Sequence, residues 1–219
     1  MTTEAVREAR YEAAPAIAVI VTVQVLIAIV SDRRHWDLWI LPWWTWIVLA
    51  APVAGLFGAI FATEPHETTR HRHLALAMVT TVVVANAAAL AALIGSLLTQ
   101  TPTGPELLLK ALGVWLTNVV TFGLWLWELD GGGPVQRSRG RTVIELQFPQ
   151  DENPHLARPG WHPRLTDYVY VSLTNSIAFS PTDAMPLSGR VKLVMAAETI
   201  VSIGSIVLVA ARAVNVLGS

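Results

Sequence analysis

The chain has 219 residues, of which 53% are hydrophobic and only 14% charged, and its formal net charge is −1. A soluble domain carries about 25% charged residues, so this composition excludes an ordinary soluble protein and offers no basic footprint for nucleic acid. It predicts a multi-pass protein of a cell membrane, either an inner or a plasma membrane. The chain has no cysteine, which excludes disulfides and thiolate metal sites.

Four apolar stretches in the first 128 residues predict four membrane-spanning helices. They are Ala13–Val30, Leu38–Phe61, Leu74–Leu98 and Leu107–Trp127. Each has about the length that a helix needs to cross the hydrocarbon core of a bilayer, roughly 17–25 residues. We expect Pro15 in the first turn of the first helix, where its missing N–H costs little.

Tryptophans recur at helical spacing around the start of the second stretch, at Trp36, Trp39, Trp43 and Trp46. Tryptophan is enriched at the headgroup level of membrane proteins, so the pattern predicts an aromatic belt on one side of a helix. The polar connection that follows, residues 62–73, contains Glu64, His66, Glu67, His71 and His73. Histidines and carboxylates can bind zinc, but His71 and His73 would point in different directions on a helix. We expect a solvated or pH-sensitive connection, with no metal site and no cofactor.

Residues 129–166 form the only sizeable extramembrane segment. They divide the chain into a four-helix region (1–128), this segment, and a C-terminal unit (167–219). The segment contains Gly131–Gly133 and an extended-looking Thr142–Phe148, and it is too short to build its own core. The sequence has no Ser-His-Asp order, no phosphate-binding glycine loop and no His-Glu-x-x-His motif, so we do not expect an enzyme.

The C-terminal unit begins with Tyr168–Ser180, which is too short to span a bilayer comfortably and carries hydroxyl and amide side chains. Pro181 ends this stretch, and a long apolar helix then runs to Asn215. Irregular backbone at membrane depth is tolerated only inside protein or beside water. We therefore predict an all-α polytopic membrane protein with five full transmembrane helices and one short or re-entrant helix near the C-terminus.

Residues 168–215 resemble the pore module of tetrameric potassium and cation channels, in which a pore helix and a filter precede an inner helix. The resemblance is carried by the Tyr-rich start with Thr174, by the run from Asp183 through Pro186 to Arg190, and by the final Val209–Val214. The Ala-Phe-Ser-Pro-Thr-Asp segment, 178–183, also looks like that of a family of uncharacterised bacterial membrane proteins. Where a potassium filter has glycines, this chain has Ala178 and Ser180, so we expect no potassium-selective filter.

The resemblance implies a set of pore or filter candidates on the hairpin: Thr174, Asn175, Ser176, Ala178, Phe179, Ser180, Thr182 and Asp183. Asp183 has two readings that are compatible, because it could attract cations at a pore mouth or cap the final helix. The hydroxyl and amide groups of the hairpin could line a cavity or bond to its own backbone.

On the final helix, one face carries Val191, Met195, Glu198, Ser202, Ser205, Val209 and Arg212 at steps of three and four. An ionisable residue inside a span is a functional hypothesis by default. We expect Glu198, Ser202, Ser205 and Arg212 to line a pathway. The alternative is a polar seam in which Glu198 pairs with Lys192, Arg190 or a neighbouring helix.

These patterns predict a channel-like protein in the lipid bilayer that forms a homo-oligomer, a tetramer by the resemblance, and conducts monovalent cations. The alternative is a non-conducting membrane scaffold or a transporter subunit whose hairpin is structural. The charge bias of the loops favours a cytoplasmic N-terminus, whereas a channel-like hairpin requires the reverse orientation.

Overall fold

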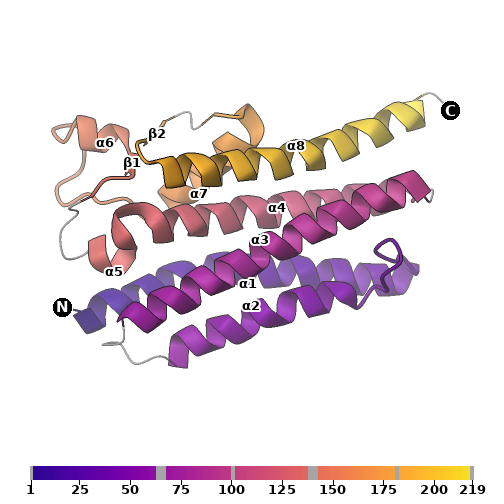
Figure 1. The fold of residues 1–219 in the computed structure, drawn as a ribbon, viewed down its shortest axis with the longest axis horizontal. Coiled ribbons are helices and arrows are strands. Elements are labelled where there is room, and N and C mark those ends of the chain that lie inside the picture. Colours follow the sequence, from indigo (N-terminus) through magenta and orange to yellow (C-terminus); the bar gives the residue numbers. More distant parts are fainter. Residues whose placement is uncertain (1, 63–67, 100–101, 138–142, 181–182, 218–219) are drawn as a thin grey trace.

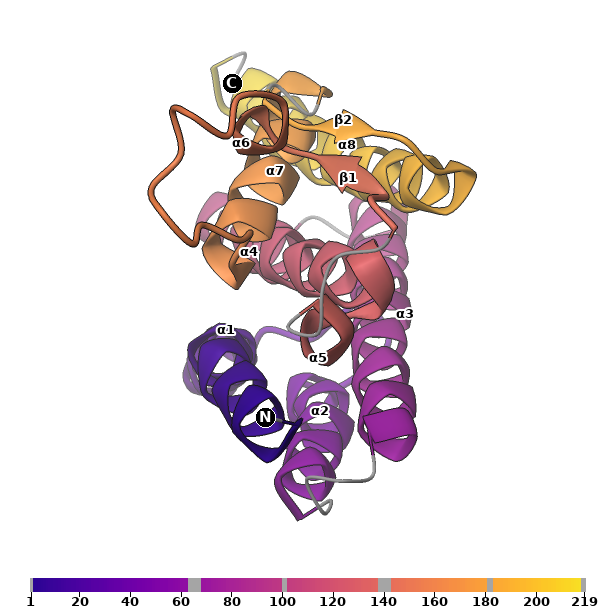
Figure 2. The ribbon, with the colours of Figure 1, turned by 90° about the vertical axis from the view of Figure 1, so that its left-hand side faces the viewer.

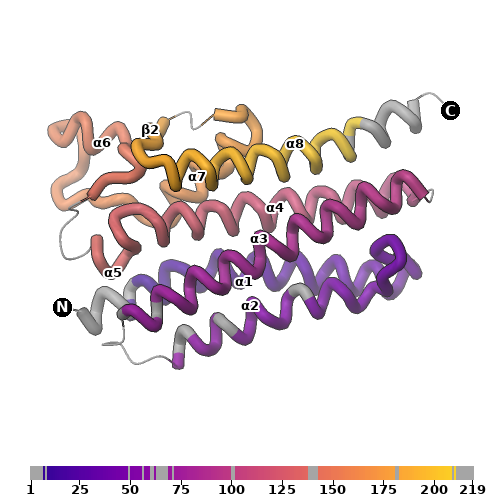
Figure 3. Tube along the Cα trace, viewed as in Figure 1, coloured from indigo at the N-terminus to yellow at the C-terminus, as the bar shows by residue number. Residues whose placement is uncertain are grey.

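Long helices packed side by side form an elongated bundle (Figures 1 and 3). The computed structural model describes the chain apart from residues 1, 63–67, 100–101, 138–142, 181–182 and 218–219. Its five longest helices are α1 (Thr2–Arg34), α2 (Thr45–Ala62), α3 (Thr68–Thr99), α4 (Gly104–Leu129) and α8 (Gly189–Leu217). Four described helices, α1, α3, α4 and α8, are long and apolar enough to cross a membrane, and α2 has a shorter apolar stretch, Thr45–Ala59. The protein is therefore mostly helical, with the helices of a membrane protein.

Helix α4 lies at the centre of the bundle, where it packs against α1, α3, α7 (Leu165–Ala178) and α8 (Figure 2). Glu106 accepts a hydrogen bond from the backbone N–H of Thr103 at 3.4 Å, which satisfies one of the free donors at the helix start. Four residues on, the buried Lys110 donates to Glu106 and to the carbonyl of Asp37, each at 2.7 Å. A charge that is buried at this end of the bundle is thereby paired and hydrogen-bonded.

The segment between α4 and α7 folds over one end of the bundle as a cap. It contains a 3-10 turn η1 (Asp130–Gly132), two short helices α5 (Pro134–Arg137) and α6 (Pro149–Glu152), and a short strand β1 (Leu146–Gln147). Strand β1 pairs antiparallel with β2 (Met185–Pro186), which lies between α7 and α8. The chain before α7 and the chain after it therefore meet at the same end of the bundle (Figures 1 and 2).

The described part of the cap shares the hydrophobic core of the bundle. Leu146 and Phe148 are buried, and the Phe148 ring packs edge-on against Tyr168 of α7 at a centroid distance of 5.2 Å. The Trp161 ring also packs edge-on against Phe148, at a centroid distance of 6.1 Å. Aromatic burial thus attaches the cap to α7.

The second predicted helix begins later than the sequence pattern indicates. Helix α2 starts at Thr45, and Leu38 instead pairs with Leu41 in an isolated bridge. Trp39 has a left-handed backbone (φ 59°), and Pro42 follows, so the chain turns where helical periodicity predicted a helix. The prediction of a tryptophan stripe on one helix was therefore wrong, because only the last of the four tryptophans lies in α2.

Trp39 instead joins the start of α2 to the end of α3. Its indole N–H donates to the Thr99 hydroxyl at 2.9 Å. Its ring lies over Gly95, where an added Cβ would be 3.0 Å from ring carbons. The absence of a side chain at Gly95 is what allows the ring to lie so close to α3.

The first helix also differs from its prediction. Helix α1 begins at Thr2, so Pro15 lies inside the helix and not in its first turn. The polar N-terminal residues continue the same helix ahead of the apolar stretch, and hydropathy alone does not reveal that extension. The other predicted helices lie within α3, α4 and α8, and the predicted short helix overlaps α7.

Candidate functional site

A buried carboxylate, Glu198, lies at the meeting point of α4, α7 and α8. It is fully buried, with 0% of its surface exposed. It follows Gly189, the first residue of α8, by nine positions, which places it about 14 Å along the helix axis. That is close to half of a hydrocarbon core of about 30 Å.

Helix α7 supplies both side chains that bind this carboxylate. The Ser172 hydroxyl is bonded to Oε1 of Glu198, and the Asn175 amide donates to Oε2 at 2.8 Å. The second amide hydrogen of Asn175 reaches the carbonyl of Met195 at 3.0 Å. Because Ser172 and Asn175 are three positions apart, they lie on the same face of α7. Two polar side chains of this short helix are therefore directed at one carboxylate in α8.

Two further contacts extend the polar core into α4. The Ser172 hydroxyl also lies 2.7 Å from the carbonyl oxygen of Val119. The Asn118 amide donates to the Ser202 hydroxyl at 3.3 Å, one helical turn beyond Glu198. Asn118 and Ser202 both have 0% exposure. We call Asn118, Ser172, Asn175, Glu198 and Ser202 the polar core.

Several amides inside the bundle keep a polar atom that has no partner among the described residues. They are Gln24 (Oε1), Asn86 (Nδ2) and Asn118 (Oδ1), all at most 2% exposed. Asn86 also accepts from the Thr117 hydroxyl at 3.1 Å. Buried polar atoms of this kind are usually satisfied by ordered water or an ion. The interior around α4 thus offers hydrogen-bonding capacity beyond what its own side chains use.

The structure brings only some of the predicted hairpin residues to the polar core. Asn175 is bound to Glu198, whereas the hydroxyls of Thr174 and Ser176 donate to carbonyls of their own helix at 3.0 and 2.8 Å. The remaining described candidates lie exposed on the surface; they are Ala178, Phe179, Ser180 and Asp183. Thr182 lies outside the described residues.

The described part of the predicted face of the final helix, which does not include the side chain of Val209, is buried within the chain. Val191, Met195, Glu198, Ser202 and Ser205 are all at most 5% exposed. The Ser205 hydroxyl donates to the carbonyl of Val201 in its own helix at 3.0 Å. The side chain of Arg212, although in α8, lies outside the described residues. The face that was expected to line a pathway is therefore directed at α4 and α7 of the same chain.

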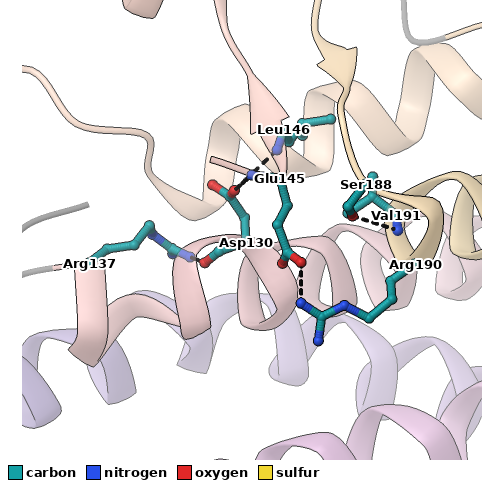
Figure 4. Close-up of polar contacts among 7 residues, drawn as sticks. All are labelled: Asp130, Arg137, Glu145, Leu146, Ser188, Arg190 and Val191. Atoms are coloured by element: carbon teal, nitrogen blue, oxygen red, sulfur yellow. Dashed lines mark hydrogen bonds and ion pairs between the residues drawn. The ribbon is translucent and has the colours of Figure 1, made fainter. Parts of the chain in front are cut away.

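The partner of Glu198 differs from the two basic candidates that the sequence suggested. Arg190 forms an ion pair with Glu145 of the cap (Figure 4), and Lys192 is exposed. The correct alternative was a neighbouring helix, α7. Ser172 is one of the hydroxyl residues of the predicted hairpin, but nothing in the sequence indicates that it binds a carboxylate 26 positions away.

Sequence reasoning missed the residue that holds the cap together, Asp130, at the end of α4. Its Oδ1 accepts from the backbone N–H groups of Glu145 at 2.9 Å and Leu146 at 3.1 Å (Figure 4), and its Oδ2 accepts from the Tyr168 hydroxyl at 2.6 Å. Arg137 donates to the carbonyl of Asp130 at 2.5 Å and lies over the Tyr168 ring at 5.2 Å. The only signal in the sequence is an aspartate followed by Gly131–Gly133, all three of which adopt positive φ. Such residues let the chain reverse tightly over the carboxylate.

The polar core is interpreted from its own residues, because comparison of the chain with family models, curated proteins and solved structures finds no match.

Proposed function

We propose that the chain is a multi-pass membrane protein that moves protons or other monovalent cations through the interior of its own bundle, with Glu198 as the binding carboxylate. In this arrangement α1, α2, α3, α4 and α8 span the membrane, and α7 is re-entrant. The complete burial of Glu198 between helices of one chain favours a path inside each bundle over a pore around a symmetry axis. Oligomer formation is compatible with this path but is not required for it.

The re-entrant position of α7 is supported by its length and its flanks. Its 14 residues measure about 21 Å, which is short of the hydrocarbon thickness of about 30 Å. The pairing of β1 with β2 joins the chain on either side of the helix. Discontinuous helices that end inside the bundle are a recurring way to place binding groups at the middle of a membrane.

The topology can be checked by labelling single cysteines, because the chain has none of its own. We expect cysteines at Leu156 and Leu187, both exposed, to react with an impermeant maleimide from the same side of sealed vesicles. A cysteine at Arg33, which is exposed in the last turn of α1 at the opposite end of the bundle, is the control and should react only from the other side. If Leu156 and Leu187 labelled from opposite sides, α7 would be a full span.

A count of hydrogens around Ser172 is the observation that carries the proposed function. Its hydroxyl has one hydrogen, yet both Oε1 of Glu198 and the carbonyl of Val119 lie within bonding reach. When Glu198 is ionised, the hydroxyl can donate to only one of these two acceptors, and the Val119 carbonyl keeps the backbone bond of its own helix. When Oε1 carries a proton, the carboxyl donates to Ser172 and Ser172 donates to Val119. The site is therefore built to take up one proton or to place a cation where that hydrogen would be.

Glu198→Gln tests the proposal, because glutamine reproduces the hydrogen pattern of the protonated carboxyl without being able to release a proton. We expect liposomes with the wild-type protein to collapse a pH or monovalent-cation gradient, and those with Glu198→Gln to match empty liposomes. The variant should unfold at the wild-type temperature, since its amide can donate to Ser172. Ser205→Ala is the matched control, because that buried hydroxyl bonds only to its own helix, and its flux should be retained.

A second candidate function is a non-conducting scaffold in which Glu198 only fastens α7 to α8. It is favoured by the engagement of both carboxylate oxygens by α7 side chains. In that case wild-type liposomes would hold their gradients as empty ones do. Glu198→Ala would then act only on stability, by removing the acceptor that Ser172 and Asn175 share.

A further inference from the structure

We propose that a second site, remote from the polar core, binds a primary ammonium group joined to a nearby anionic group, the chemistry of an ethanolamine phosphate headgroup. The site is a cavity of about 120 Å³ between the start of α3 and the glycine turn that follows α4. It lies at the capped end of the bundle, where the ends of spanning helices meet the headgroups of a bilayer. This inference does not depend on Glu198 or on cation movement.

The cavity has an acidic wall made by Glu128. This side chain lines the cavity although only 4% of its surface is exposed. The positive charges of Arg137 and Arg72 act on its carboxylate, but Arg137 is already bonded to the carbonyls of Trp127 and Asp130. A buried carboxylate needs donors to compensate its lost hydration, and a ligand ammonium would supply three.

Basic side chains from α3 also line the cavity. Arg72 and His73 line the cavity together with the exposed Thr69. The Nε of Arg72 is buried and has no partner among the described residues. A guanidinium that lines a cavity suits a phosphate or carboxylate oxygen. The cavity therefore presents a negative and a positive wall to one small ligand.

The glycine turn keeps the ammonium subsite small. A Cβ at Gly133 would lie 3.1 Å from Oε2 of Glu128, and the backbone there has φ 95°, so glycine is required for the turn to close over the carboxylate. The Pro134 ring and Val135 complete the lining. A primary ammonium can approach Glu128 and donate to it, whereas a trimethylammonium is bulkier and has no N–H. We therefore expect selection of ethanolamine over choline headgroups.

The test uses the full-length protein in nanodiscs of phosphatidylcholine and phosphatidylglycerol, and titrates soluble O-phosphoethanolamine by calorimetry with phosphocholine as the competitor. A parallel arm adds phosphatidylethanolamine to the nanodisc lipid and counts retained lipids by native mass spectrometry. Glu128→Gln and Arg72→Gln should each weaken binding about 30-fold or more, the effect of removing one partner of a buried charge pair. Glu152→Gln and Arg158→Gln, which remove exposed charges of the cap outside the cavity, should leave binding unchanged.

The arms separate the two sources of the ligand. Retention of phosphatidylethanolamine alone supports a lipid site, and binding of soluble phosphoethanolamine supports the same chemistry for a free ligand. Equal binding of phosphocholine, no binding in either arm, or full binding by both Glu128→Gln and Arg72→Gln would overturn the proposal. Should Glu128→Gln fail to fold, Arg72→Gln decides alone, because Arg72 is only half-buried at the edge of the bundle.

Discussion

Replacing Asp130 with alanine is expected to lower the free energy of unfolding by about 3–5 kcal/mol. The carboxylate is fully buried and accepts from two backbone N–H groups and from the Tyr168 hydroxyl. Each buried donor left without a partner costs about 1–3 kcal/mol. The loss should appear as a lower midpoint of unfolding in mild detergent, followed by tryptophan fluorescence.

The matched control for this change is Asp151→Ala. Asp151 also accepts a backbone hydrogen bond, from Phe148 at 2.9 Å, but it is only half-buried and caps the single turn of α6. Its loss should cost about 1 kcal/mol, as for an ordinary helix cap. Tyr168→Phe tests one branch of the network, and its effect should largely disappear in the Asp130→Ala background. Equal effects of the two alanine variants would show that Asp130 does not hold the cap.

Gly123→Ala is expected to separate α7 from α4. A Cβ at this position would lie 2.7 Å from Cγ2 of Val169 and 2.8 Å from its Cα. The second atom is backbone, so no change of rotamer can relieve the contact, and overpacking of this kind costs about 1–3 kcal/mol. Helix α7 carries Ser172 and Asn175, so its displacement should also break their hydrogen bonds to Glu198 in the polar core.

Gly58→Ala is the reference for this comparison, because its Cβ would meet nothing within 4 Å. Both substitutions gain helix propensity of about 1 kcal/mol, and the difference between their unfolding free energies isolates the contact with Val169. Val169→Ala should rescue Gly123→Ala only in part, since it removes Cγ2 and leaves the Cα in place. Complete rescue would mean that the side chain and not the backbone sets the distance between the helices.

The helical class and the positions of α3, α4, α7 and α8 could be predicted from apolar runs because hydropathy and helical spacing are local properties. The same spacing placed Glu198 and Ser202 on one buried face of α8, as the structure has them. It could not identify Ser172 as a partner of Glu198, because that choice depends on how α7 crosses α8. A hydrogen bond between residues 26 positions apart produces no periodic pattern in a single sequence.

The start of α2 and the role of Asp130 escaped prediction for a related reason. Trp39 leaves the helical conformation while its indole reaches Thr99, 60 positions away. From its neighbours in the sequence, Asp130 would be taken for a residue that ends a helix before a glycine turn. Its hydrogen-bond partners are instead Glu145, Leu146 and Tyr168. In both places a distant contact decides the local conformation, which is how tertiary structure overrides propensity.

The pairing of β1 with β2 has a consequence for biogenesis. Met185 leaves the ribosome about 40 residues after Gln147, a delay of roughly 2–8 s at ordinary rates of synthesis. During that interval β1 lacks its strand partner, and Ser172 and Asn175 have no Glu198 to bind. A half-polar helix cannot rest alone among lipid chains. In the re-entrant arrangement proposed above, α7 therefore has to wait at the membrane surface and enter with α8 as one hairpin, so a nascent chain that stops before Glu198 would leave α7 outside the bilayer.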